Sequence, residues 1–373
     1  MNKYAILLFF LAVPSWAGYN GYDYRQKISI LHAQVPNTDQ TNFPVLISTT
    51  LATLATTANG GHVKNSSGFD IVFSTRDDCG FLLNWDTETY TASSGNLIVW
   101  VKHPLVTTAS DATMYICYGN SSITTYQGVS ASAWDADYKG VWHLPDGSSL
   151  QLSDSTNNGN TLTNNNTVAA TAAQIDGGAS FTGSSSQHLS RASASLAFAA
   201  QTFSIWVKPT SLANAYTGLI SQTTVGGAET VFTVYVKSDG TMAVYMDVGG
   251  GTGGNMFYDG TGATTLTTGN WYYISVSYDS TNGIKSYVNG ALDKSVAPAG
   301  THNSPTGTFG IGTDEGFPTG RYLTGAEDEA RVSDISRSAD WVKTEYNNQS
   351  SPSTFYTIGP ETTTNGNFFQ VFL

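Results

Sequence analysis

Residues 271–293 have the sequence WYYISVSYDSTNGIKSYVNGALD, which predicts two antiparallel strands joined by a tight turn. In the first half, Ile274 and Val276 alternate with serines, which is the two-residue period of a strand that buries one face. Asn282-Gly283 then supplies residues that tolerate the positive φ of a hairpin turn. We therefore expect this hairpin to lie within a larger antiparallel sheet.

Similar alternating runs, separated by small polar residues, continue on both sides of the hairpin. Only 12% of the residues are charged, while the chain has 38 Gly, 20 Tyr, 17 Phe and 8 Trp. This composition is typical of short strands, small turns and large apolar side chains, and it predicts an all-β protein. Residues 338–347 (SADWVKTEYN) predict one short helix near the C-terminus, with Ser338 as its N-cap.

The charge balance narrows the classes of partner. The chain has 16 basic and 28 acidic residues, which gives a formal charge of −12. Nucleic-acid binding depends on basic contacts to phosphate, so this charge argues against it. An anionic membrane surface is disfavoured for the same reason.

The first 17 residues have the pattern of a secretory signal peptide. Lys3 precedes an apolar run at 5–13, and Ser15-Trp16-Ala17 is a small-x-small cleavage site. The run is too short to span a membrane, and no other stretch approaches the ~20 apolar residues that a spanning helix needs. We expect cleavage after Ala17 and a mature protein that is secreted or held at the cell surface.

Cys79 and Cys117 are the two cysteines of the chain. An even number in an exported chain predicts one disulfide, and the alternative is a pair of buried thiols. The two residues lack the C-x-x-C spacing of zinc and redox motifs.

Residues 18–120 predict an antiparallel β-sandwich, because five strand-like runs are each followed by turn residues. The runs are 24–30 (YRQKISI), 43–48 (FPVLIS), 69–74 (FDIVFS), 97–102 (LIVWVK) and 113–119 (TMYICYG). In this order they resemble the domain of unknown function 2341. That family occurs in exported or surface proteins of bacteria and archaea and has no known chemistry, so the resemblance implies a fold and a location.

Residues 121–136 are small and polar around Tyr126 and Trp134, and they predict a linker. A second series of motifs extends from 137 to 359, and residues 360–373 form a tail. The motifs include 141–144 (VWHL), 176–183 (DGGASFTG), 203–209 (FSIWVKP) and the hairpin of 271–293. They resemble laminin-G-like, concanavalin A-like domains, which implies a jelly roll whose relatives mostly bind glycans or protein surfaces.

The same resemblance implies a calcium ion at one rim of the second domain. Asp154, Asn160 and Asp328 would supply oxygen ligands from two loops that this fold brings together. Thr182 stands where the family often has a further Asp or Asn. The alternative for these residues is ordinary capping of turns.

The sequence contains only weak matches to the residue patterns of catalytic sites. A glycosidase needs two carboxyl groups facing each other across the sugar, and Glu327 and Glu329 share one side of a predicted strand. This stretch departs from the longer acidic pattern that glycosidases of the concanavalin A-like fold usually show. The sequence has no G-x-S-x-G motif, and His143 is interpreted as a satisfied core or edge histidine. We expect no enzymatic activity.

Strand parity divides the sheet residues of the second domain into an inward and an outward set. The inward set, which includes Phe203, Ile205 and Val207, is expected to form the core. Four large aromatic residues belong to the outward set: Trp206, Tyr235, Tyr245 and Tyr273. Flat rings among polar groups suit the apolar face of a sugar, so we predict a glycan-binding concavity there. The alternative is that a loop, the first domain or another subunit covers these rings.

Together these features predict a secreted, non-catalytic recognition protein that binds carbohydrate or a cell-surface protein. One alternative is a structural surface protein, such as a filament or coat subunit, that self-assembles through the same folds. The other is a glycoside hydrolase of the concanavalin A-like fold.

Overall fold

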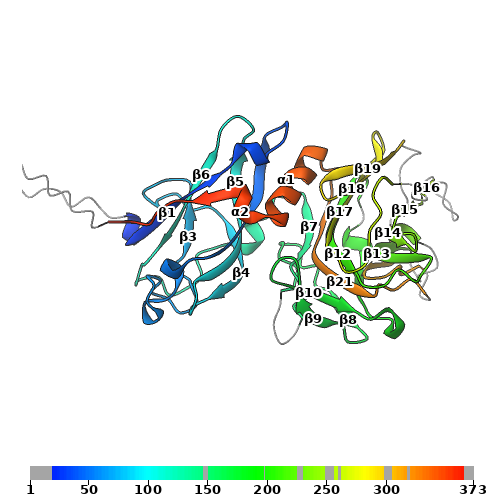
Figure 1. Cartoon of the computed structure of the whole chain (residues 1–373), viewed down its shortest axis with the longest axis horizontal. Coiled ribbons are helices and arrows are strands. Elements are labelled where there is room, and N and C mark those ends of the chain that lie inside the picture. The colour runs from blue at the N-terminus through cyan, green and yellow to red at the C-terminus, as the bar shows by residue number, and fades with distance from the viewer. Residues whose placement is uncertain are drawn as a thin grey trace, which may run out of the picture.

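The computed structural model describes residues 19–145, 150–196, 198–224, 230–247, 256–258, 262–297, 305–316 and 320–364. The expected signal peptide and the apolar end of the tail lie outside these ranges. Two β-rich domains lie side by side along the longest axis, with helix α1 (Ala339–Ser350) between them (Figure 1). Within the described ranges, no helix has the length and apolar character needed to cross a membrane.

The first domain contains two sheets, and the five predicted strands are all present in them. One sheet has the order β22 (Tyr356–Ile358), β1 (Tyr24–Ile30), β6 (Ala112–Tyr118) and β3 (Val72–Ser74), with β23 (Thr362–Thr363) also paired to β1. The other has the order β2 (Gln40–Thr50), β5 (Asn96–Val106) and β4 (Trp85–Thr91). Ile28, Val45 and Phe73 belong to one continuous buried core. Strand β4 was not predicted.

The second domain is a sandwich of an eight-stranded and a seven-stranded sheet. The first sheet has the order β19 (Ala291–Val296), β18 (Gly283–Val288), β17 (Tyr272–Asp279), β12 (Gln201–Pro209), β21 (Gly325–Ser333), β10 (Gly177–Phe181) and β9 (Ala169–Ala172), and β7 (Tyr138–Trp142) pairs with β21. The second has the order β16 (Met256–Tyr258), β15 (Met242–Met246), β14 (Thr230–Lys237), β13 (Tyr216–Thr223), β20 (Thr308–Ile311), β11 (His188–Ala192) and β8 (Thr163–Asn165).

Short 3₁₀ helices occur in the connections of both domains. They are Tyr19–Gly21, His32–Gln34, Ala52–Leu54, Thr57–Asn59, Ser130–Ser132, Gly183–Ser185 and Ser193–Leu196.

The predicted hairpin and the predicted core of the second domain are both confirmed. Strands β17 and β18 pair with Ile274 opposite Val288 and with Asp279 opposite Gly283. The inward residues of β12, β14, β15 and β17 form one cluster: Phe203, Ile205, Val207, Phe232, Val234, Val236, Met242, Val244, Met246, Ile274, Val276 and Tyr278. Strand parity therefore identified the core face of these strands correctly.

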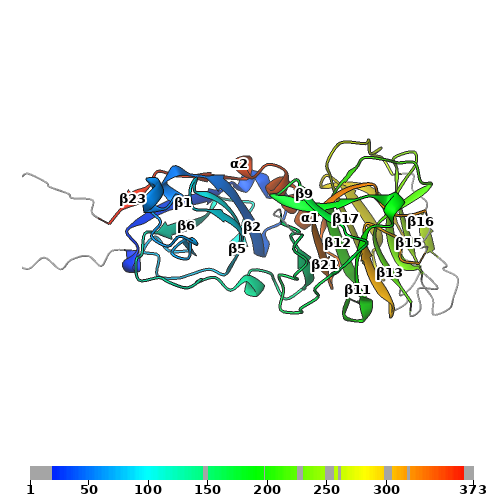
Figure 2. The ribbon, with the colours of Figure 1, turned by 90° about the horizontal axis from the view of Figure 1, so that it is seen from below.

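Helix α1 contacts both domains (Figure 2). It begins at the predicted cap, where Ser338 Oγ accepts a hydrogen bond from the N–H of Trp341 at 3.1 Å. Toward the first domain, Trp341 meets Phe43 edge to face, with ring centroids 5.1 Å apart. Toward the second, Val342 is buried against aromatic residues of the sheet. The short helix α2 (Pro352–Phe355) follows α1.

The last strands belong to the first domain, which corrects the predicted boundary at residue 359. The sequence motifs assigned all residues from 137 to 359 to the second domain. Instead, β22 pairs with β1, with Tyr356 opposite Ile30, and β23 pairs with the start of the same strand. The prediction was wrong because an alternating pattern identifies a strand but not the sheet that it joins.

Candidate functional site

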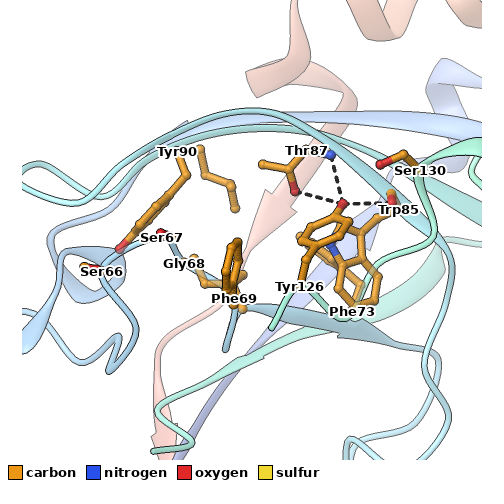
Figure 3. Close-up of a pocket in the computed structure, with 12 residues that line it drawn as sticks. Ser66, Ser67, Gly68, Phe69, Phe73, Trp85, Thr87, Tyr90, Tyr126 and Ser130 are labelled. Atoms are coloured by element: carbon orange, nitrogen blue, oxygen red, sulfur yellow. Dashed lines mark hydrogen bonds between the residues drawn. The ribbon is translucent and has the colours of Figure 1, made fainter. Parts of the chain in front are cut away.

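A cavity of about 520 Å³ opens in the first domain. This volume falls within the roughly 300–1,000 Å³ that is typical of small-ligand sites. Strand β3 and the loop before it, strands β4 and β5, and the segment after β6 supply its lining. Five aromatic rings take part (Figure 3): Phe69, Phe73, Trp85, Tyr90 and Tyr126.

The five rings differ in burial, which separates the base of the cavity from its accessible walls. Phe73 and Trp85 are each 1% exposed and meet edge to face, with ring centroids 5.7 Å apart. Phe69, Tyr90 and Tyr126 are half-buried, so parts of their rings remain open to solvent. Phe69 and Tyr126 also meet edge to face, with centroids 6.2 Å apart.

Tyr126 comes from the segment predicted to be a linker, and hydrogen bonds hold it against β4. Its hydroxyl donates to the carbonyl of Trp85 at 3.0 Å and accepts from the N–H of Thr87 at 3.1 Å (Figure 3). Further along, Trp134 Nε1 donates to Asp86 Oδ2 at 3.2 Å. Segment 121–136 therefore packs against the first domain and completes one wall of the cavity.

The remaining polar groups of the cavity are mostly hydroxyls, and none of its lining residues is charged. Ser66 and Ser67 are exposed, and Ser130 is half-buried. Gly68 has a φ of +72°, and a Cβ there would lie 2.6 Å from the ring of Tyr90. Glycine at this position therefore lets the ring lie directly against the loop.

The opposite face of β4 meets the second domain. Trp85 and Thr87 line the cavity, while Asp86 and Glu88 alternate with them and approach His143 of the second domain. His143 Nε2 lies 3.2 Å from Asp86 Oδ2, and its Nδ1 lies 2.7 Å from Oε1 of Glu329 on β21. His143 is therefore a satisfied buried histidine, as predicted.

Arg331 extends this buried network to α1. Its Nη2 donates to Glu329 Oε2 at 2.7 Å, and its Nη1 donates to Glu345 Oε1 at 3.2 Å. The guanidinium lies over the ring of Trp100, 4.2 Å from the centroid. Both domains and the helix between them thus share one set of ion pairs.

Burial and neighbouring charges set the protonation states in the network. Burial raises the pKa of Glu88 well above its usual value, and the negative charge of Glu329 adds to this effect. Burial alone would lower the pKa of His143, but the carboxylates of Glu329 and Asp86 outweigh it and raise that pKa well above its usual value. Burial would raise the pKa of Glu329, but His143 and Arg331 outweigh it and lower that pKa.

Two of the four aromatic residues predicted to bind glycan lie under α1. Trp206 is 2% exposed and Tyr273 is 0% exposed. Trp206 Nε1 donates to Gln349 Oε1 at 2.7 Å, and the Tyr273 hydroxyl donates to Glu345 Oε2 at 2.8 Å. Helix α1 therefore covers this face, whereas the alternative to a glycan site had named a loop, the first domain or another subunit as the cover.

The other two lie on the second sheet of the sandwich, so the four rings do not form one concavity. Tyr235 is 2% exposed, and its hydroxyl donates to Asp314 Oδ2. Tyr245 is half-buried on the neighbouring strand. The prediction of a shared glycan site was wrong because parity identifies an outward face but neither its sheet nor its cover.

The residues expected to bind calcium have other partners in the structure. Both carboxylate oxygens of Asp154 accept hydrogen bonds: one comes from the N–H of Val141 in β7 at 3.1 Å, and the others come from its own loop, including one from the N–H of Asn160 at 2.8 Å. Asn160 Oδ1 accepts from Ser195 Oγ at 2.8 Å. Asp328 Oδ2 accepts from the N–H of Ile175 at 2.8 Å. Calcium binding stays a prediction from the sequence.

The two carboxyl groups considered for glycoside hydrolysis are inaccessible. Glu327 and Glu329 are both 0% exposed. Neither carboxyl oxygen of Glu327 has a hydrogen-bond partner among the described residues. Burial raises the pKa of Glu327 well above its usual value, which favours the uncharged acid.

The predicted disulfide is present. Cys79 and Cys117 are bonded, with their Cα atoms 6.3 Å apart. The bond ties the loop after β3 to strand β6.

Comparison with protein families supports both resemblances that the sequence motifs suggested. Residues 176–343 match the concanavalin A-like lectin/glucanases superfamily. The chain contains a concanavalin A-like domain. Residues 67–133 match the domain of unknown function 2341, and this range holds every residue that lines the aromatic cavity except Ser66. No curated protein matches the chain.

Several solved structures resemble part of the chain distantly. Domain 4 of AbnA, a GH43 extracellular arabinanase from Geobacillus stearothermophilus, in complex with arabinotriose, is 20% identical with a TM-score of 0.44, over 57% of this chain and 100% of that one. The binding domain of Paraclostridial Mosquitocidal Protein 1 is 12% identical with a TM-score of 0.43, over 56% and 52%. Trypanosoma rangeli sialidase is 12% identical with a TM-score of 0.41, over 58% and 34%.

Proposed function

We propose that this chain is a secreted, non-catalytic recognition protein whose first domain binds an uncharged glycan in the aromatic cavity. The observation that carries the proposal is the lining: open ring surface of Phe69, Tyr90 and Tyr126 beside hydroxyl groups. A sugar has an apolar face that packs on such rings and a polar edge that bonds to hydroxyls.

The absence of charged residues from this lining favours a neutral sugar over an acidic one. A carboxylated sugar in this cavity would lose hydration without gaining a cationic partner. The net charge of −12 would also repel an anionic glycan from the protein as a whole.

Other features support the remaining parts of the proposal. The match of residues 176–343 to the concanavalin A-like lectin/glucanases superfamily supports carbohydrate recognition by the chain, whereas the lining of the cavity alone assigns glycan to the first domain. The burial of Glu327 and Glu329 supports binding without hydrolysis. The disulfide and the signal-peptide pattern support an oxidising compartment outside the cytoplasm.

The test is binding of neutral and acidic oligosaccharides to the mature chain, followed by calorimetry with the best ligand. Phe69→Ala removes a half-buried ring and should weaken binding about tenfold or more, since ~1.4 kcal/mol corresponds to tenfold. Phe81→Ala is the matched control, because Phe81 is a ring of the same domain that is 64% exposed and does not line the cavity. It should leave the affinity unchanged.

Binding that is equally strong in wild type and a folded Phe69→Ala variant would place the ligand elsewhere and contradict the proposal. A folded protein that binds no glycan but self-assembles in light scattering would favour the structural alternative. Hydrolysis of a bound oligosaccharide would favour the glycosidase.

A further inference from the structure

Three side chains with potential metal-ligating atoms meet at the domain interface: Glu88 of β4, His143 after β7 and Glu329 of β21. Their ligand atoms all lie within 4.8 Å of one another. The side chains of both glutamates are 0% exposed, and that of His143 is 7% exposed. The cluster lies across β4 from the aromatic cavity and is a separate feature of the molecule.

The imidazole of His143 has the orientation of a metal ligand. Its Nδ1 faces both glutamates, 2.7 Å from Oε1 of Glu329 and 3.7 Å from Oε2 of Glu88. Its Nε2 lies 3.2 Å from Asp86 Oδ2. Metal-binding histidines commonly donate their second N–H to a carboxylate, which fixes the ring and its tautomer. Asp86 is in the position to accept that bond.

One oxygen of the cluster is buried without a partner. Glu88 Oε2 accepts from Trp100 Nε1 at 3.1 Å, but Glu88 Oε1 has no hydrogen bond from any described residue. Burying a carboxylate oxygen without a partner is costly. A cation beside Oε1 would remove this cost.

The excess of acidic groups in this buried network also favours a bound cation. Asp86, Glu88, Glu329 and Glu345 supply four carboxyl groups, all with buried side chains. Arg331 pairs with two of them, Glu329 and Glu345. Even with His143 as an imidazolium, acidic groups outnumber cations in this set, and a divalent ion would reduce the excess.

We propose that Glu88, His143 and Glu329 bind one divalent transition-metal ion, with Zn²⁺ as the model, across the domain interface. Two carboxylates and an imidazole suit such ions, whereas calcium and magnesium prefer oxygen ligands alone. The ion bonds to His143 Nδ1 in place of the proton that otherwise lies between Nδ1 and Glu329, and it also displaces the proton that burial favours on the Glu88 carboxyl, so binding releases protons to solvent. Because the ligands come from both domains, the ion holds β4 against β21.

The test uses the full mature chain after treatment with a chelator. Titration with Zn²⁺ should show one ion bound per chain, and Co²⁺ in its place should give a visible d–d absorption spectrum. Zinc should raise the melting temperature, because an ion that binds only the folded state stabilises it. Glu88→Gln should weaken zinc binding at least tenfold. Asp86→Asn should weaken it roughly 10–100-fold, as is typical when the partner of a metal-binding histidine is lost.

Glu361→Gln is the matched control, since Glu361 Oε2 pairs with His62 Nδ1 at 2.8 Å in a glutamate–histidine pair away from the interface. It should leave zinc binding unchanged. Zinc binding by Glu88→Gln as tight as that of the wild type would assign the ion to other groups and overturn the proposal. A wild-type chain that melts at the same temperature in zinc and in chelator would overturn it as well, and this comparison needs no variant.

Discussion

The imidazole of His103 has its protonation state fixed by two backbone groups. Its Nε2 lies 3.2 Å from the carbonyl oxygen of Thr113, and its Nδ1 lies 3.3 Å from the N–H nitrogen of Leu105. A neutral ring with its hydrogen on Nε2 satisfies both contacts, whereas a protonated ring would turn a second N–H toward a donor. Burial lowers the pKa of His103 from its ordinary value of 6.5.

This lowered pKa predicts a loss of stability in mild acid. Since the folded-state pKa lies below the unfolded one, the contribution of His103 is complete above about pH 6.5 and is lost as the pH falls through the folded-state value. We expect the free energy of unfolding to fall less steeply between about pH 6.5 and pH 5 in His103→Gln than in the wild type. Urea titrations across this range measure the difference, and parallel curves would contradict the prediction.

Residues whose partners are near in sequence were the ones that could be predicted. Ser338, expected to cap the helix that follows it, accepts a hydrogen bond from the N–H of Trp341, three residues further along, at 3.1 Å. The cavity was missed because Phe69, Trp85 and Tyr126 come from three separate segments. Each is an ordinary apolar residue in its own segment, and only the packing of the sheets brings the rings together.

At the scale of the elements, one side chain of α1 satisfies two backbone hydrogen-bonding groups at the edge of strand β2. Asn348 Oδ1 accepts from the N–H of Leu46 at 2.7 Å, and its Nδ2 donates to the carbonyl of Leu46 at 3.0 Å. Asn348→Ala would leave both buried backbone groups unpaired, at about 1–3 kcal/mol for each group. We therefore expect the free energy of unfolding, measured by urea denaturation, to fall by about 2–6 kcal/mol.

The neighbouring asparagine offers the comparison for this prediction. Asn347 is half-buried and donates one hydrogen bond, to the carbonyl of Gln34 at 2.8 Å. Asn347→Ala should therefore cost less than Asn348→Ala. If the two variants lost equal free energy of unfolding, the hydrogen bonds of Asn348 to β2 would not be the source of the stabilisation, and the prediction would be wrong.

The two-residue alternation of a strand can be recognised in a sequence only where one face of the strand is apolar and the other is polar. Strands β12 and β17 have such a face, so their core residues were identified correctly. Strand β4 does not, because Asp86 and Glu88 lie on the side that meets the second domain. The strand was therefore missed, since nothing local shows that His143, far along the chain, will pair with these acids.

At the scale of the whole molecule, the calcium ion expected from the laminin-G-like resemblance is open to a direct test. In this structure Asp154 accepts hydrogen bonds from its own loop, and calcium would have to replace some of them. If the ion binds, the melting temperature should be higher in calcium than in a calcium-selective chelator, because binding to the folded state stabilises it. Asp154→Asn should abolish that difference. A melting temperature that is the same in calcium and in chelator would contradict the prediction that this chain binds calcium.

Domain order and fold class could be predicted because both follow from local motifs repeated along the chain. The boundary could not, because the partner of β22 is β1, at the opposite end of the sequence. Contacts between the two ends of a chain leave no trace in a local pattern of apolar and polar residues.

The return of the C-terminal strands to β1 means that the second domain is an insertion within the first. As the chain leaves the ribosome, β1 can pair with β6 on one side, but its other edge stays open until β22 has been made. The inserted domain is then complete while its host is not. An open edge strand can pair with other chains, so the nascent protein is exposed to misassembly throughout that interval. Strand β22 thus closes the free edge of β1 only after the whole inserted domain has been made.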